Sequence, residues 1–167
     1  MEKKKILPAV IAVVLMALII VGAVGVKLYE KYSYSKETMD LSRYYGIEKE
    51  GQVPIVLADV VAEEKAANID GNDYLPLSFV QEQLNSRFYY DMNEKLLLYT
   101  TALDLYEIPL DSTTYTVSGE AAEHTCPIFV LQDEVPYVSL SFMENFSNFI
   151  CNVYEAPHRL QIYTENV

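Results

Sequence analysis

Residues 74–80 read YLPLSFV, and residues 137–143 read YVSLSFM. Equivalent positions in the two stretches lie 63 residues apart. Self-similarity at a fixed spacing indicates a structural unit that the chain uses twice. In each copy the first half has the composition of a strand, and we expect Ser78 and Ser141 to open a short helix by accepting hydrogen bonds from its first free amides.

The sequence on either side of each copy predicts paired strands. The residues DGN at 70–72 suit the positive-φ positions of a tight hairpin before the first copy, and residues 128–137 supply a matching strand and turn before the second. Two further strand-forming runs follow each copy, at 87–90 and 95–101 and again at 150–154 and 159–164. The sequence therefore predicts an α+β fold with two tandem β-β-α-β-β modules, in which Phe79 and Phe142 occupy equivalent core positions.

A different signal precedes the repeat. Residues 6–26 are uncharged and follow three consecutive lysines, Lys3 to Lys5. As a helix this run covers roughly 30 Å, the thickness of a bilayer's hydrocarbon core. We expect a single-pass transmembrane helix, a signal-anchor in the cell membrane, with its N-terminus cytoplasmic and the remaining chain extracellular. A cleaved secretory signal is the alternative, although residues 23–25 form a weak cleavage site.

These signals divide the chain into five predicted parts. They are a cytoplasmic tail at 1–5, a transmembrane anchor at 6–26, a juxtamembrane linker at 27–46, a first module at 47–103 and a second module at 104–167.

Charge excludes one class of partner. The chain carries 12 Lys plus Arg against 24 Asp plus Glu. After the anchor, 9 basic residues face 23 acidic ones, a net charge of −14. Such a surface repels phosphate backbones, so the sequence predicts no nucleic-acid binding.

The cysteines and histidines are few and widely spaced. Cys126 and Cys151 could form a disulfide outside the cytosol, and the alternative is two separate buried thiols. Together with His124 and His158 they lack a paired ligand spacing such as C-x-x-C or H-x-x-x-H. We therefore predict no metal site and no cofactor.

Catalytic signatures are also missing from the sequence. No nucleophile elbow or other local motif accompanies the serines, cysteines or acidic residues, so we predict no catalytic residues. A carbohydrate could stack on exposed aromatic rings, and Tyr89, Tyr106 and Tyr115 are the candidate glycan-contact residues if they face solvent. The alternative is that these tyrosines pack within the fold.

The first copy of the repeat carries a family resemblance. Residues 74–76 leading into a short helix, then FYYD at 88–91 and LLLYTT at 96–101, resemble the copper amine oxidase N-terminal-like stalk domain of surface proteins from Gram-positive bacteria. The resemblance implies a shared shape and no copper chemistry.

The order of the parts adds to this resemblance. The anchor, then YSKE at 34–37, residues 40–46 and the two modules look like the anchor and stalk region of clostridial-type membrane-anchored family-18 glycoside hydrolases. In those proteins an SH3-like module and a catalytic barrel are expected after the stalk. This sequence contains no D-x-x-D-x-D-x-E motif to supply the general acid, so no catalytic residue carries over.

We therefore expect a membrane-anchored extracytoplasmic stalk or cell-envelope binding module that is not itself an enzyme. Its expected partners are the lipid bilayer through residues 6–26 and a cell-wall glycan or envelope proteins. One alternative is the N-terminal fragment of a cell-wall-active glycoside hydrolase whose barrel is missing. Another is a carbohydrate-binding surface receptor.

Overall fold

The computed structural model describes residues 3–33 and 39–164. It has two units, Met1–Met39 and Asp40–Val167. In the first unit, α1 (Lys3–Tyr32) includes the window Ile11–Tyr29, which is long and apolar enough to cross a membrane and is not buried against other residues. An N-terminal apolar helix of this kind is compatible with a membrane anchor or a signal sequence.

The second unit is mixed α and β, as predicted, and opens with a short helix. Asp40 caps α2 (Leu41–Tyr45) by accepting a hydrogen bond from the Ser42 amide at 3.0 Å. Gly46 ends the helix with a left-handed φ of 63°. This helix lies inside the predicted linker 27–46, so the boundary between the two units falls earlier, at Met39.

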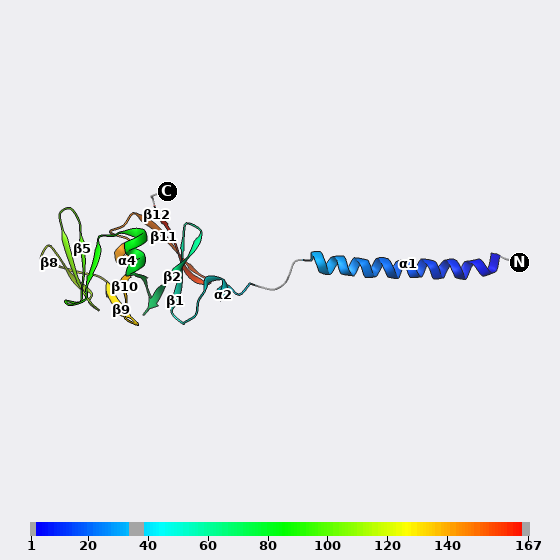
Figure 1. The fold of residues 1–167 in the computed structure, drawn as a ribbon, viewed down its shortest axis with the longest axis horizontal. Coiled ribbons are helices and arrows are strands. Elements are labelled where there is room, and N and C mark those ends of the chain that lie inside the picture. The colour runs from blue at the N-terminus through cyan, green and yellow to red at the C-terminus, as the bar shows by residue number, and fades with distance from the viewer. Residues whose placement is uncertain (1–2, 34–38, 165–167) are drawn as a thin grey trace. The chain divides into compact units, whose positions relative to one another are not determined.

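Within residues 40–164, twelve strands form two sheets (Figure 1). The seven-stranded sheet has the order β11 (Phe149–Glu155), β12 (His158–Thr164), β1 (Gln52–Leu57), β2 (Val60–Ile69), β3 (Asn72–Pro76), β10 (Val135–Ser139) and β9 (Phe129–Gln132). The five-stranded sheet has the order β4 (Phe88–Asp91), β5 (Leu96–Thr100), β6 (Leu105–Pro109), β7 (Thr114–Val117) and β8 (Glu120–Glu123). The helical segments between strands are α3 (Leu77–Phe79), the π-helical turn η1 (Val80–Leu84) and α4 (Leu140–Met143).

The two copies of the repeat meet through a local two-fold relation. Strands β3 and β10 pair antiparallel, with Leu75 opposite Val138. These two residues are also equivalent at the repeat spacing of 63 residues. Consistently, Tyr74 pairs with Ser139 while its equivalent Tyr137 pairs with Pro76. The local two-fold axis therefore passes between Leu75 and Val138.

The second hairpin of the second copy is exchanged into the sheet of the first copy. Hairpin β11–β12 joins the first copy's strands, because β12 pairs parallel with β1. The first copy's hairpin β4–β5 has a different setting. Strand β5 pairs antiparallel with the next strand along the chain, β6, so β4 to β8 form a meander in chain order.

This exchange changes the predicted modular arrangement. The order β-β-α-β-β does occur twice, as β2–β5 and as β9–β12, and the predicted strands lie within one or two residues of the observed ones. The strands of the two copies, however, share sheets, and residues 40–167 form one compact unit. The structure thus does not divide this unit at residues 103 and 104, because β12 pairs with β1 and β10 pairs with β3 across the two copies.

The predicted helix starts also need correction. Helices α3 and α4 begin directly after their strands, with Pro76 and Ser139 at the cap positions and no side-chain cap hydrogen bond. Ser78 and Ser141 therefore lie inside the helices and do not cap them. Helix α4 has only four residues, which is shorter than the repeat pattern predicts.

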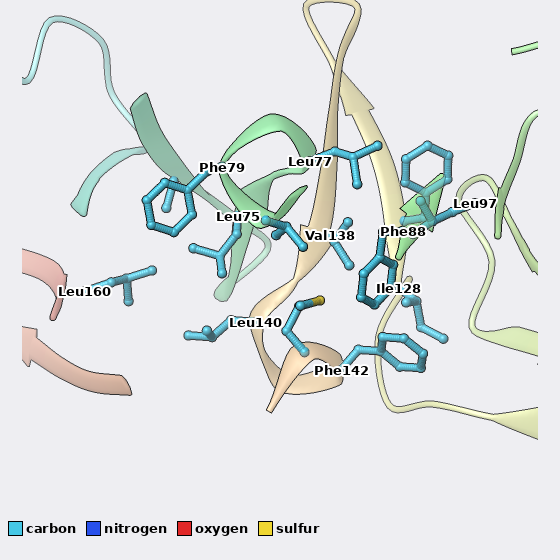
Figure 2. Packing of buried hydrophobic residues seen from close by; sticks show 14 of the residues in the cluster. Leu75, Leu77, Phe79, Phe88, Leu97, Ile128, Val138, Leu140, Phe142 and Leu160 are labelled. Carbon is cyan, nitrogen blue, oxygen red and sulfur yellow. The ribbon is translucent and has the colours of Figure 1, made fainter. Parts of the chain in front are cut away.

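One hydrophobic core spans both copies (Figure 2). Phe79 and Phe142 are each 1% exposed, which confirms their predicted core positions. In the close view Leu75 and Val138 lie between the first copy's Phe79 and the group around Phe142. The core is therefore continuous across the local two-fold axis.

Candidate functional site

A cleft of about 520 Å³ lies at the C-terminal end of η1 in the first copy and the segment after α4 in the second copy. It is lined by Gln83, Leu84, Asn85, Arg87, Tyr99, Phe146, Ser147, Asn148, Phe149 and Thr164. Gln83 and Leu84 end η1, Asn85 and Arg87 follow it, and Phe146 to Phe149 follow α4. At the repeat spacing Asn85 and Asn148 are equivalent, so the same position of each copy lines the cleft.

Asn85 fixes the backbone on both sides of the cleft. Its amide nitrogen donates to the carbonyl of Phe146 at 3.2 Å. Its side-chain oxygen accepts from the Arg87 backbone N–H at 3.1 Å. The first bond joins the two copies, and the second turns the chain into β4. Asn85 therefore holds together the loops that carry the cleft's other polar groups.

The cleft combines aromatic rings with polar groups. Tyr99 is buried, and its ring centroid lies 5.3 Å from that of Phe146 in an edge-to-face arrangement. Gln83 and Asn148 are exposed amides, which offer both donors and acceptors. Within the part of the chain that the structure describes, the Ser147 hydroxyl is buried and has no hydrogen-bond partner. The half-buried rings of Phe146 and Phe149, beside amides and a hydroxyl, suit a ligand that has apolar faces and many hydroxyl groups.

The three predicted glycan-contact tyrosines are not brought together. Tyr89 on β4 is 61% exposed, as a contact residue should be. Tyr106 and Tyr115 are half-buried and stack on each other with centroids 6.3 Å apart. They pack on Phe146 at 5.0 Å and Phe142 at 5.5 Å respectively. Tyr106 and Tyr115 therefore support the fold instead of presenting a platform to solvent, and burial raises the pKa of Tyr106.

The structure holds Cys126 and Cys151 as free cysteines, the first buried and the second half-buried. Cys126 is buried, with its sulfur 3.4 Å from the Ser139 hydroxyl. Cys151 lies on β11, and burial raises its pKa to about 12. Among residues 3–33 and 39–164 no cluster of three or more His, Cys, Asp or Glu side chains could hold a metal ion.

An ion pair joins the exchanged hairpin to the first copy. His158 Nε2 lies 2.8 Å from Asp73 Oδ1, and Asn68 donates to the same oxygen at 2.7 Å. Glu155 lies 3.5 Å from the other ring nitrogen. The hydrogen bond to Asp73 is the main cause of the raised pKa of His158. This group links β12 to β3 and is separate from the cleft's lining residues.

A second groove, of about 560 Å³, lies on the first copy. Leu57, Val60 and Phe79 are among its apolar lining residues. Three carboxylates also line it, those of Glu63, Glu64 and Glu82. Glu64 accepts a hydrogen bond from the Ser78 hydroxyl. This groove is acidic, like most of the protein's surface.

Sequence reasoning missed the cleft residues, including Gln83, Asn85, Arg87 and Asn148. One signal could have found two of them, because Asn85 and Asn148 stand at the same position of the repeat. No protein-family model, curated protein or solved structure matches this chain.

Proposed function

We propose that this protein is a membrane-anchored extracytoplasmic binding module whose cleft holds a cell-envelope glycan. The proposed role is binding, without a chemical step. The observation that carries the proposal is the cleft itself, where aromatic rings and side-chain amides from both copies come together. Carbohydrates have apolar faces that pack on aromatic rings and hydroxyl groups that bind amides, so the residue types fit this ligand class.

The anchor supports the extracytoplasmic placement. The window Ile11–Tyr29 is long enough to span a bilayer, and three lysines precede it at residues 3–5. Lysines at one end favour the cytoplasmic side for that end, which directs residues 40–167 outward. The same signals support a single-pass topology that places the cleft among envelope polymers.

Topology can be tested with protease added to intact cells that express the protein with a tag at each end. We expect the tag after residue 167 to be removed and the tag before residue 1 to stay protected until the cells are lysed. Release of an untethered ectodomain into the medium would indicate a cleaved signal sequence. Protection of the second unit would contradict the extracytoplasmic placement.

Glycan binding can be tested by co-sedimentation of the detergent-solubilised protein with purified peptidoglycan and with other wall polymers. Asn148→Ala and Gln83→Ala remove exposed amides from the cleft and should weaken binding about threefold to tenfold each, which corresponds to one lost hydrogen bond. Asn152→Ala, which removes an exposed amide outside the cleft lining, is the matched control and should bind like the wild type. Equal binding by all three variants would contradict the cleft assignment.

A further inference from the structure

The cleft differs in charge from the rest of the molecule. Its lining holds one charged side chain, Arg87, and no carboxylate. The whole chain carries 24 acidic residues against 12 basic ones, and three carboxylates line the second groove. A cationic group without acidic neighbours in the lining is therefore a local exception on an acidic protein.

Arg87 is anchored through its backbone and not through its side chain. Its N–H is held by Asn85, and the next residue, Phe88, pairs with Tyr99 at the start of β4. Within the described residues, the guanidinium makes no ion pair with an Asp or Glu side chain. The side chain is exposed, so its donors can reach a ligand in the cleft.

The chemistry of the guanidinium indicates what it would bind. Its planar fork matches the two oxygens of a carboxylate or a phosphate, and charge-assisted hydrogen bonds of this kind are about twice as strong as neutral ones. At physiological ionic strength the screening length is about 8 Å, so distant carboxylates on the acidic surface oppose such a contact only weakly.

We propose that the cleft selects glycans that carry an anionic group, which pairs with the guanidinium of Arg87. The inference rests on the proposed function and deepens it by naming the ligand class. Aromatic rings and amides hold the sugar, and Arg87 distinguishes an acidic glycan from a neutral one. The anionic group is a carboxylate or a phosphate, since both fit the same donors.

The test compares one polymer with and without its carboxylates. Peptidoglycan is first acetylated at its free amines, and half of it is then converted to methylamides at its carboxylates. Poly(glycerol phosphate) provides the phosphate arm. The full-length protein in detergent is compared with Arg87→Gln and Arg87→Lys, and Arg43→Gln is the control because it removes one exposed positive charge outside the cleft lining.

We expect wild-type protein to bind the carboxylate polymer about tenfold more tightly than its methylamide form, in line with one charge-assisted hydrogen-bonded pair. Arg87→Gln should lose that preference, Arg87→Lys should keep part of it, and Arg43→Gln should keep it all. An Arg87-dependent preference for poly(glycerol phosphate) would support the same inference with phosphate as the anion.

Two results would overturn the inference, and they differ in what they say of the proposed function. Equal, Asn148-dependent binding of the carboxylate and methylamide polymers would refute the charge selection and leave glycan binding in place. Absence of wild-type binding to all the polymers would refute both. If Arg87→Gln proves unfolded by circular dichroism, the comparison of the two peptidoglycan forms on wild-type protein still decides.

Discussion

Loss of one core ring in either copy should destabilise the whole second unit and not only half of it. Phe79 and Phe142 are equivalent in the repeat, and each is 1% exposed. Replacement of a buried Phe by Ala costs about 3 to 5 kcal/mol through lost transfer energy and the cavity left behind. Phe142 also lies 4.6 Å from the ring of Phe146 and 5.5 Å from that of Tyr115, so its loss should fall near the upper end of this range.

The assay is urea unfolding of residues 40–167, followed by tyrosine fluorescence and by far-ultraviolet circular dichroism. With a slope of about 2 kcal/mol per molar urea, 3 to 5 kcal/mol lowers the midpoint by about 1.5 to 2.5 M. Because the two copies share a sheet and one core, both variants should show one transition that moves as a whole and coincides for the two probes. A two-step curve, with one step unchanged in Phe79→Ala and the other unchanged in Phe142→Ala, would refute the single folding unit.

Three further predictions concern local features. The pKa of His158 is raised, so its ion pair stabilises the fold fully below about pH 6.5, the ordinary pKa of histidine, and loses this contribution as pH rises through the folded-state pKa. The difference in thermal midpoint between the wild type and His158→Gln should therefore fall between pH 6 and pH 9. A difference that does not depend on pH would argue against the pair. Glu134 has a left-handed φ of 67° in the β9–β10 turn, so Glu134→Gly should raise the free energy of unfolding by about 0.5 to 1 kcal/mol while Glu134→Gln does not. Both thiols should resist a thiol reagent at pH 8 in the folded protein, because Cys126 is buried and the pKa of Cys151 is about 12. Both should react once the protein is unfolded without reductant. If no thiol reacts in the unfolded protein, the two cysteines form a disulfide.

Local pattern predicted the strands and core positions within the repeat, but it did not predict β1, β6, β7 or β8. Phe79 and Phe142 are buried because each follows the last strand residue by a fixed number of positions, and this geometry is set within a few residues. Tyr74 is 1% exposed and donates to the Pro127 carbonyl at 2.9 Å. That partner lies 53 residues away, so no local pattern could indicate it.

The exchange of hairpin β11–β12 and the cleft were beyond sequence reasoning for the same reason. Alternation of apolar residues shows that 159–164 form a strand, but it does not show that this strand pairs with β1 on the edge away from β11. Likewise Tyr106 and Tyr115 are of the residue type that sugar-binding platforms use. Their rings pack on Phe146 and Phe142, which no local pattern indicates. The cleft arises where the segments at the ends of η1 and α4 meet, so its polar residues form no local motif.

The pairing of β1 with β12 also has a mechanical consequence. The two strands run parallel, with Ile55 opposite Leu160 and Leu57 opposite Ile162. Tension between the amino end of β1 and the carboxyl end of β12 pulls them along their lengths in opposite directions. The hydrogen bonds between them then share the load and have to rupture together, whereas a hairpin pulled at its open end would unzip one bond at a time. A tether that enters at β1 and transmits force through β12 would therefore meet high resistance at this pair of strands, the one that the exchanged hairpin creates.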